Sequence, residues 1–152
     1  MHKKFHASGF FYHLSTQQIL LQQRKSSAPL WSLFGGENKK TEDPIDTFNR
    51  TVFKELKLKI TPKAIHPIYD YFDKKLNNNC FLFYALVSSK NKKMPARKDC
   101  MLEWFTIKQI SKLPIDEQTK QDIMIGKRVI DAAARTKEGV KKDPRQFSQN
   151  KS

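Results

Sequence analysis

Polar and apolar positions change their period several times along the 152-residue chain, and each change predicts an element. The runs "FHASGFFYHL" (5–14) and "QQILLQQR" (17–24) are rich in β-forming residues and meet at the turn-like "STQ", which predicts a hairpin. "PLWSLF" (29–34) predicts a third short strand that stops at Gly35 and Gly36.

From Asp43 the apolar spacing becomes helical and predicts a helix over 43–58. Asp43 suits the N-cap, Pro44 the first helical position and Asp46 the first turn. The apolar stripe that we expect this helix to bury comprises Ile45, Phe48, Val52 and Leu56.

The second half of the chain predicts more strands and one more long helix. The runs "AIHPIYDYF", "NCFLFYALVSS" and "MLEWFTI" are strand-like, and "KQISKLP" is a short helical turn. A helix is expected from Asp116 to Ala134. We expect one domain over 1–135 and a basic, disordered tail over 136–152, because the tail lacks apolar periodicity.

Charge narrows the range of partners. Lys and Arg number 29 against 15 Asp and Glu, a net charge of +14, which favours phosphates, nucleotides or RNA. The excess gathers in the tail and in the predicted loop "KNKKMPARK" (90–98), although solvated charge explains it equally well. No apolar run reaches the roughly 20 residues of a membrane helix.

The cysteines, histidines and strand aromatics are all expected to have structural roles. Cys80 and Cys100 form no metal or redox motif, so we expect buried thiols in a reducing, cytoplasmic compartment. The histidines show no metal spacing. Strand aromatics are able to stack on a base, but they more often belong to a core; they are Tyr12, Tyr69, Tyr71, Phe83 and Trp104.

One segment resembles a known family. Gly36, Glu42 and Arg50 have the spacing of the Nudix box, and Val52, Glu55 and Leu58 follow at their positions. "PLWSLFGG" and "EWFTIKQISKL" also resemble segments of bacterial Nudix proteins. The resemblance to the Nudix hydrolase superfamily implies an α+β fold, an α/β/α sandwich around a mixed β-sheet.

The family's chemistry implies a set of site residues. Nudix hydrolases split diphosphates with Mg²⁺ or Mn²⁺ held by box glutamates on one helix face. Here the implied catalytic residues are Glu55, Glu42 and Arg50, with Glu55 and Glu42 as metal ligands. The implied ligand-binding residues are Gly35, Gly36, Arg50 and Lys54.

Several box positions depart from the family pattern. Thr51 and Lys54 replace two glutamates, and Thr41 and Lys57 replace glycines that set the loop and the helix end. We therefore expect a degenerate member that binds a nucleotide or another diphosphate-type ligand with weak or no hydrolysis. Without those glycines, the loop is expected to deviate from the usual fold and the helix to lack its left-handed terminator.

Alternatives stay open at this point. An active Mg²⁺- or Mn²⁺-dependent pyrophosphohydrolase would recruit Asp99 or Glu103, since Lys98 stands where relatives often supply another Glu. Arg50 either positions a carboxylate or forms an ordinary pair with Asp46, which we favour slightly. Glu42 either helps an ion or caps the helix. RNA binding rests on charge alone, and a homodimer is an open option.

Overall fold

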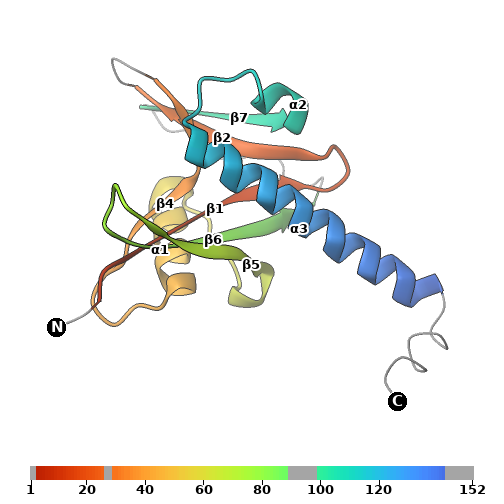
Figure 1. Ribbon diagram of the computed structural model, residues 1–152, viewed down its shortest axis with the longest axis horizontal. Coiled ribbons are helices and arrows are strands. Elements are labelled where there is room, and N and C mark those ends of the chain that lie inside the picture. The colour runs from red at the N-terminus through yellow and green to blue at the C-terminus, as the bar shows by residue number, and fades with distance from the viewer. Residues whose placement is uncertain (1–2, 26–28, 89–98, 143–152) are drawn as a thin grey trace.

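The computed structural model describes residues 3–25, 29–88 and 99–142, and it has the predicted α+β architecture. One mixed β-sheet lies between helix α1 (Pro44–Leu56) and helix α3 (Glu117–Lys142), as Figure 1 shows. The short elements are the 3-10 helix η1 (Pro62–Ala64) and helix α2 (Ile107–Ile110). The strands are β1 (Phe5–His13), β2 (Gln18–Arg24), β3 (Trp31–Ser32), β4 (Phe34–Glu37), β5 (Ile65–Asp73), β6 (Asn78–Val87) and β7 (Cys100–Thr106).

The sheet divides along strand β1. The predicted β1–β2 hairpin forms, but its ladder covers only Phe11 to His13 against Gln18 to Leu20. Nearer its start, β1 pairs with β4 on one side and runs parallel to β6 on the other, while β2 pairs with β3 and β7. Strands β1 and β2 therefore part, and the segment of β3 and β4 lies between them, with β4 paired to β1 and β3 paired to β2.

The sequence predicts the N-terminus of α1 correctly. Asp43 accepts a hydrogen bond from the backbone of Asp46, and the Asp46 side chain accepts one from Asp43, a complete capping box. Phe48, Val52 and Leu56 are buried against Phe11, Leu20 and Phe34, and the half-buried Ile45 packs beside them. The predicted apolar stripe is the core on this face of the sheet.

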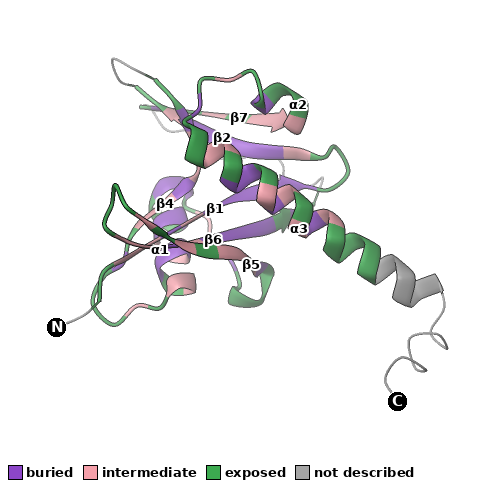
Figure 2. Ribbon diagram, viewed as in Figure 1, coloured by how far each residue is buried: buried purple, intermediate pink, exposed green. Residues whose placement is uncertain are grey.

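A second core covers the opposite face. Ile123 and Ile130 of α3 pack against β-strand residues that include Phe10, Tyr12 and Leu21. Figure 2 shows the buried positions of α3 beside the sheet and exposed positions on its outer side. Helices cover both faces, so the expected sandwich is present.

Two predicted boundaries were wrong. Gly35 and Gly36 do not end a strand; they lie inside β4, paired with Ser8 and Ala7. A Cβ at Gly35 would lie 2.3 Å from the Ala7 carbonyl oxygen, so glycine permits the close approach of β4 to β1.

Helix α3 is the other correction, since it continues past Ala134 to Lys142 into the segment predicted to be disordered. The added segment 135–142 contains five good helix formers, four of them Lys or Arg and one Glu, and they extend a helix that is already nucleated even though Gly139 lies among them. Residues 143–152 and the whole of the basic segment 90–98 lie outside the described residues, so these parts of the prediction are untested.

Candidate functional site

In the Nudix box, one face of α1 carries the metal-binding glutamates, and here that box face carries Thr51 and Glu55. Thr51 replaces one of the glutamates. Its side chain is buried, and its hydroxyl donates to the Phe48 carbonyl oxygen at 2.8 Å. Its methyl group lies near Gly36, where an added Cβ would be 3.3 Å away. Thr51 therefore packs against β4 and its hydroxyl is turned back onto the helix.

Glu55, the other position on this face, is engaged by an arginine. The Glu55 side chain is 10% exposed and forms an ion pair with Nη2 of Arg24, from the end of β2. Arg24 is 57% exposed, so the pair places a buried carboxylate under a more accessible cation. The carboxylate expected to hold a metal already has a positive partner.

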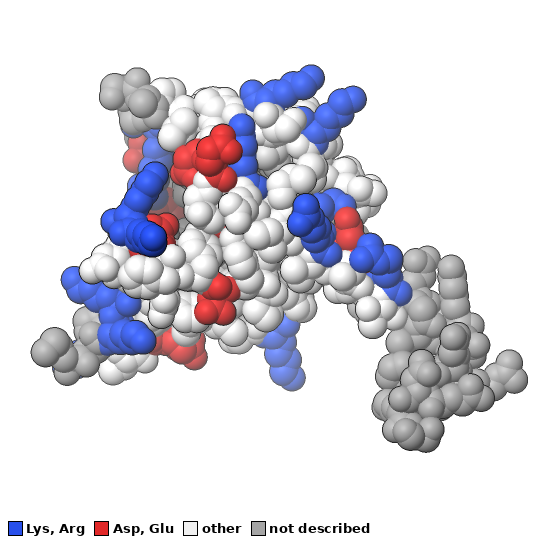
Figure 3. All heavy atoms as spheres, in the orientation of Figure 1, with Lys and Arg blue, Asp and Glu red and all other residues white. Residues whose placement is uncertain are grey.

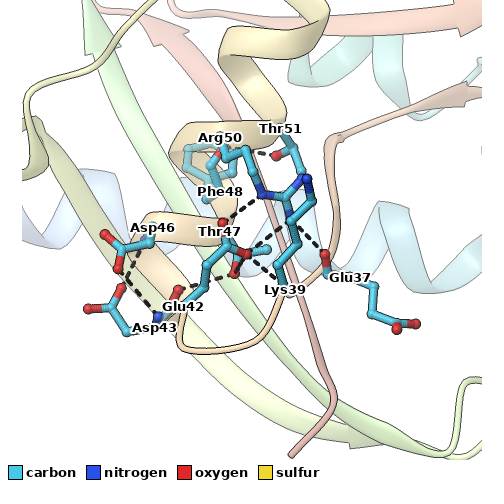
Figure 4. A network of polar contacts seen from close by, with 9 residues as sticks. All are labelled: Glu37, Lys39, Glu42, Asp43, Asp46, Thr47, Phe48, Arg50 and Thr51. Atoms are coloured by element: carbon cyan, nitrogen blue, oxygen red, sulfur yellow. Dashed lines mark hydrogen bonds and ion pairs between the residues drawn. The ribbon is translucent and has the colours of Figure 1, made fainter. Parts of the chain in front are cut away.

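Glu42 is held by Arg50, as Figure 4 shows. Arg50 donates to both Glu42 oxygens, at 2.6 Å from Nε and 3.1 Å from Nη2. The Lys39 backbone N–H and the Thr47 hydroxyl donate to the same carboxylate at 2.7 and 3.0 Å. Mainly because of the Arg50 hydrogen bond, the pKa of Glu42 falls to about 2.

The favoured pairing of Arg50 with Asp46 was wrong. In Figure 4, Asp46 turns toward Asp43, while Arg50 reaches Glu42 and also donates to the Glu37 carbonyl oxygen at 2.9 Å. Arg50 thus joins the end of β4 to the helix and fixes the intervening loop. It positions the Glu42 carboxylate, which is the other interpretation that the sequence left open.

The helix end differs from expectation, whereas the predicted deviation of the loop stays a prediction. Thr41 has φ 74° and Lys57 has φ 56°, so both adopt left-handed backbone where the family pattern has glycine. Lys57 still ends α1, and its N–H donates to the Phe53 carbonyl oxygen. The left-handed terminator is therefore present without glycine, at a conformational cost of about 1–2 kcal/mol per residue.

A cavity of about 350 Å³ opens where β1 and β2 part. It reaches from Arg24 at one side to the first turns of α3 at the other. Its lining is mostly polar: His6, Ser8, Gln22, Arg24, Ser32, Leu33, Gly35, Tyr71, Asp73, Leu76, Cys80, Asp116, Gln118, Thr119 and Asp122.

Asp122 anchors the α3 side of this cavity. It is 4% exposed and accepts hydrogen bonds from Tyr69 at 2.6 Å, Tyr71 at 3.2 Å and Gln118 at 3.0 Å. Burial raises the pKa of the Asp122 carboxyl, while these hydrogen bonds act in the opposite direction. Tyr71 lines the cavity, whereas Tyr12 and Phe83 are core residues as expected.

Both cysteines are buried, as predicted. Cys80 lines the cavity, and burial is the main reason that the pKa of its thiol rises to about 11. A raised pKa leaves little thiolate, the nucleophilic form, at neutral pH, so Cys80 is suited to a packing role in the cavity wall.

The predicted ligand-binding residues are not all brought together. Gly35 lines the cavity, and Gly36 lies beside it in β4 against Thr51. Arg50 instead lines a separate hollow of about 320 Å³ on the outer side of α1, and Lys54 is exposed and lines neither.

The proposed replacement acids occupy different places. Glu103 pairs with Leu21, and residues directly opposite in an antiparallel ladder project to the same face. Leu21 belongs to the α3-side core, so Glu103 projects away from α1 and Glu55. The Asp99 carbonyl oxygen accepts a hydrogen bond from Lys25, next to Arg24. Lys98 lies outside the described residues.

This donor set fits a divalent cation poorly. Mg²⁺ needs several oxygen ligands, but Glu55 is paired with Arg24 and Glu42 is surrounded by donors. Over 3–25, 29–88 and 99–142, no group of three or more His, Cys, Asp or Glu residues could hold a metal ion. The positive charge near Glu55 comes from the protein itself.

Comparison with known families identifies the class of protein that this fold and box define. The NUDIX domain model matches residues 5–125, and the chain belongs to the Nudix superfamily. Nudix hydrolases generally use divalent metals. A comparison with curated protein sequences found no match.

Solved structures confirm the fold. The NUDIX domain of Shewanella oneidensis NrtR, complexed with ADP ribose, matches with a TM-score of 0.67 and 16% identity over 86% of this chain and 90% of that one. Caenorhabditis elegans Ap4A hydrolase matches with a TM-score of 0.64 and 10% identity over 85% of this chain and 99% of the hydrolase. An Enterococcus faecalis MutT/nudix family protein matches with a TM-score of 0.55 and 19% identity. That match covers 69% of this chain but only 44% of the Enterococcus protein.

Two residues of the candidate site were missed in the sequence. Arg24 ends a strand, and Asp122 lies in a helix otherwise read for its apolar stripe. The acidic residue beside buried Ile123 was an available signal, because an acid on the buried face of a helix needs polar partners. No feature of the neighbouring sequence indicated that Arg24 would lie at the site.

Proposed function

We propose that this protein binds a nucleotide or another diphosphate-type ligand in the cavity between β1 and β2, with weak or no hydrolysis. The observation that carries the proposal is the ion pair between Arg24 and Glu55. It engages the box carboxylate that would otherwise hold a metal, and it leaves a cation on the cavity wall.

The cavity supports such a ligand at both ends. At one end, Arg24 offers the N–H donors that phosphate oxygens accept. At the other end, Asp122 and Tyr71 offer polar groups suited to the hydroxyl and amino groups of a nucleoside. Its volume of about 350 Å³ lies within the usual range for small-molecule sites.

Poor metal fit supports weak hydrolysis. In the family's chemistry the metal neutralises phosphate oxygens and activates water, and both tasks need carboxylates that remain available. Thr51 offers no carboxylate, and those of Glu42 and Glu55 accept from arginines. We therefore assign Glu42 and Arg50 a structural role in the loop.

The test measures binding and turnover on the same protein. Calorimetric titration with ADP-ribose, nucleoside triphosphates and dinucleotide polyphosphates is expected to find a ligand, and phosphate-release assays with Mg²⁺ or Mn²⁺ to stay near background. Robust metal-dependent hydrolysis that Glu55→Gln abolishes would instead establish an active pyrophosphohydrolase.

A further inference from the structure

Arg24 is held at the junction between the cavity and helix α1. It is the last residue of β2 and pairs with Cys100 of β7. Two positions earlier, Gln22 donates to the Leu33 carbonyl oxygen at 2.9 Å and accepts from the Cys100 thiol at 3.3 Å. The strand end is therefore fixed from both sides, and the Arg24 side chain reaches Glu55 from a defined position.

The guanidinium has unused binding capacity. Arginine carries five N–H donors, and within the described ranges the hydrogen bonds of the Arg24 side chain go to Glu55 alone. Arg24 is 57% exposed and lines the cavity, whereas the Glu55 side chain is 10% exposed. A ligand in the cavity has access to the cation while the carboxylate stays behind it.

We propose that Arg24 supplies the charge that a divalent ion would supply beside Glu55, and that the diphosphate group of the ligand binds to Arg24 directly and without metal. The inference deepens the proposed function and rests on it. Glu55 then acts as a positioning residue: it holds the guanidinium at the cavity wall and does not touch the ligand.

This arrangement reverses the expected effect of neutralising Glu55. At a metal site, removing a ligand carboxylate weakens metal-dependent phosphate binding. Beside Arg24, the Glu55 charge opposes phosphate binding through repulsion and through its claim on the guanidinium. Glu55→Gln retains a hydrogen-bond acceptor for Arg24 and removes the charge, so it is expected to strengthen binding.

The experiment titrates the full chain with ADP by calorimetry, once in EDTA and once with excess Mg²⁺. The wild type is expected to bind equally in both. Arg24→Gln should weaken binding about tenfold or more, because a charge-assisted contact is lost. The ADP affinity of Arg24→Lys should lie between those of the wild type and Arg24→Gln, since lysine keeps the charge but lacks the planar guanidinium. Glu55→Gln should tighten binding in EDTA a few-fold.

Lys63→Gln is the matched control, because it also removes one positive charge but at an exposed position in η1 that does not line the cavity. It should change ADP affinity little. Thermal melting of every variant checks that the fold is retained, and Glu55→Gln tests the proposal through a gain of affinity, which unfolding does not produce.

Two outcomes would overturn the inference in distinguishable ways. ADP binding that requires Mg²⁺ and is lost in Glu55→Gln contradicts metal-free recognition but leaves a nucleotide-binding protein. If neither ADP nor the other nucleotides bind with or without Mg²⁺, the proposed function fails together with the inference.

Discussion

Glu42 lies on the loop that leads into α1 and Arg50 lies within the helix, so their ion pair ties the loop to α1. Their side chains are 16% and 30% exposed, and two further donors, Lys39 and Thr47, converge on the same carboxylate. A group this enclosed contributes more than a typical surface pair, although partial exposure still screens it.

The pKa of Glu42 makes this contribution pH-dependent. Its folded value of about 2 is below the ordinary value of 4.5, so the stabilisation is fully present above about pH 4.5 and is lost as pH falls toward 2. Glu42→Gln is expected to lower the free energy of unfolding by about 2 kcal/mol at pH 7. The difference in free energy of unfolding between wild type and Glu42→Gln should shrink as pH falls below 4.5. Urea unfolding at several pH values measures this difference.

Asp46→Asn is the control for this series, since it replaces a nearby acid in the first turn of α1 whose side chain is hydrogen-bonded to Asp43, while Arg50 is hydrogen-bonded to Glu42 and Glu37. If Glu42→Gln shows a constant deficit from pH 7 to pH 3, the ion pair with Arg50 does not stabilise the fold.

Thr41 and Lys57 make a second residue-scale prediction, because both hold left-handed backbone without glycine. Thr41→Gly and Lys57→Gly should each raise the free energy of unfolding by about 1 kcal/mol. Chemical denaturation measures the change. For Lys57 the gain is reduced by loss of its contact with the Phe53 ring, 5.8 Å from Nζ to the centroid.

Matched controls exist for both substitutions. Thr61 has φ −62°, and Lys59 is outside the set of left-handed residues, so glycine at either position removes no strain. Thr61→Gly and Lys59→Gly should be neutral or destabilising. Equal effects in each pair would show that the left-handed backbone carries no strain.

At the scale of elements, α1 has two buried faces with different tasks. Phe48, Val52 and Leu56 pack into the core, while Thr51 and Glu55 meet β4 and the end of β2. The element survives the loss of the family's acids because burial of its apolar stripe and its capping box do not involve them.

The box face can be tested by rebuilding it. Thr51→Glu places a carboxylate one helical turn from Glu55, but Arg24 still competes as a cation. Adding Arg24→Gln removes that competitor, so the double variant should bind Mn²⁺ about tenfold more tightly than the wild type. Calorimetric titration with Mn²⁺ alone measures this, independently of any hydrolysis.

The single variants separate the contributions. Thr51→Glu alone should gain less Mn²⁺ affinity than the double variant, because the Arg24 charge remains. Equal Mn²⁺ binding by wild type and double variant would show that Arg24 and Thr51 do not determine the poor metal fit.

At the scale of the whole molecule, the charge of +14 does not form one patch on the face drawn in Figure 3. Lys and Arg side chains lie there in several separate places around the outline, with acidic groups between them. On that face the excess charge by itself defines no RNA-binding surface. None of the described helices is both long and apolar enough to cross a membrane.

The end of α3 extends away from the sheet in Figure 1, and this predicts the effect of truncation. Up to Thr136, where the description of side-chain burial ends, Ile130 is the last buried residue of the helix, and positions 132–136 are exposed. Truncation after Thr136 should leave the melting temperature nearly unchanged, because the helix is already exposed over 132–136 and the removed sequence lacks apolar periodicity. Calorimetric melting tests this, and a fall of many degrees would show that the removed segment docks on the domain.

The sequence by itself determined the elements, the box register and the family. These follow from patterns among residues that are close in the sequence: apolar periodicity, the Asp43 capping box and the spacing from Gly36 to Glu55. The β1–β2 hairpin and the buried stripe of α1 were predicted for the same reason. Helix length was missed because residues 135–142 carry helix propensity without apolar periodicity.

Only the tertiary structure decided the site. Arg24 and Glu55 are 31 positions apart, and Tyr69 and Asp122 are 53 apart, so each pair depends on strand register and helix packing. Packing likewise imposes left-handed backbone on Thr41 and Lys57, against their local preference. An ion pair or a hydrogen bond needs its two groups within a few ångströms, and only the assembled sheet and helices set that distance.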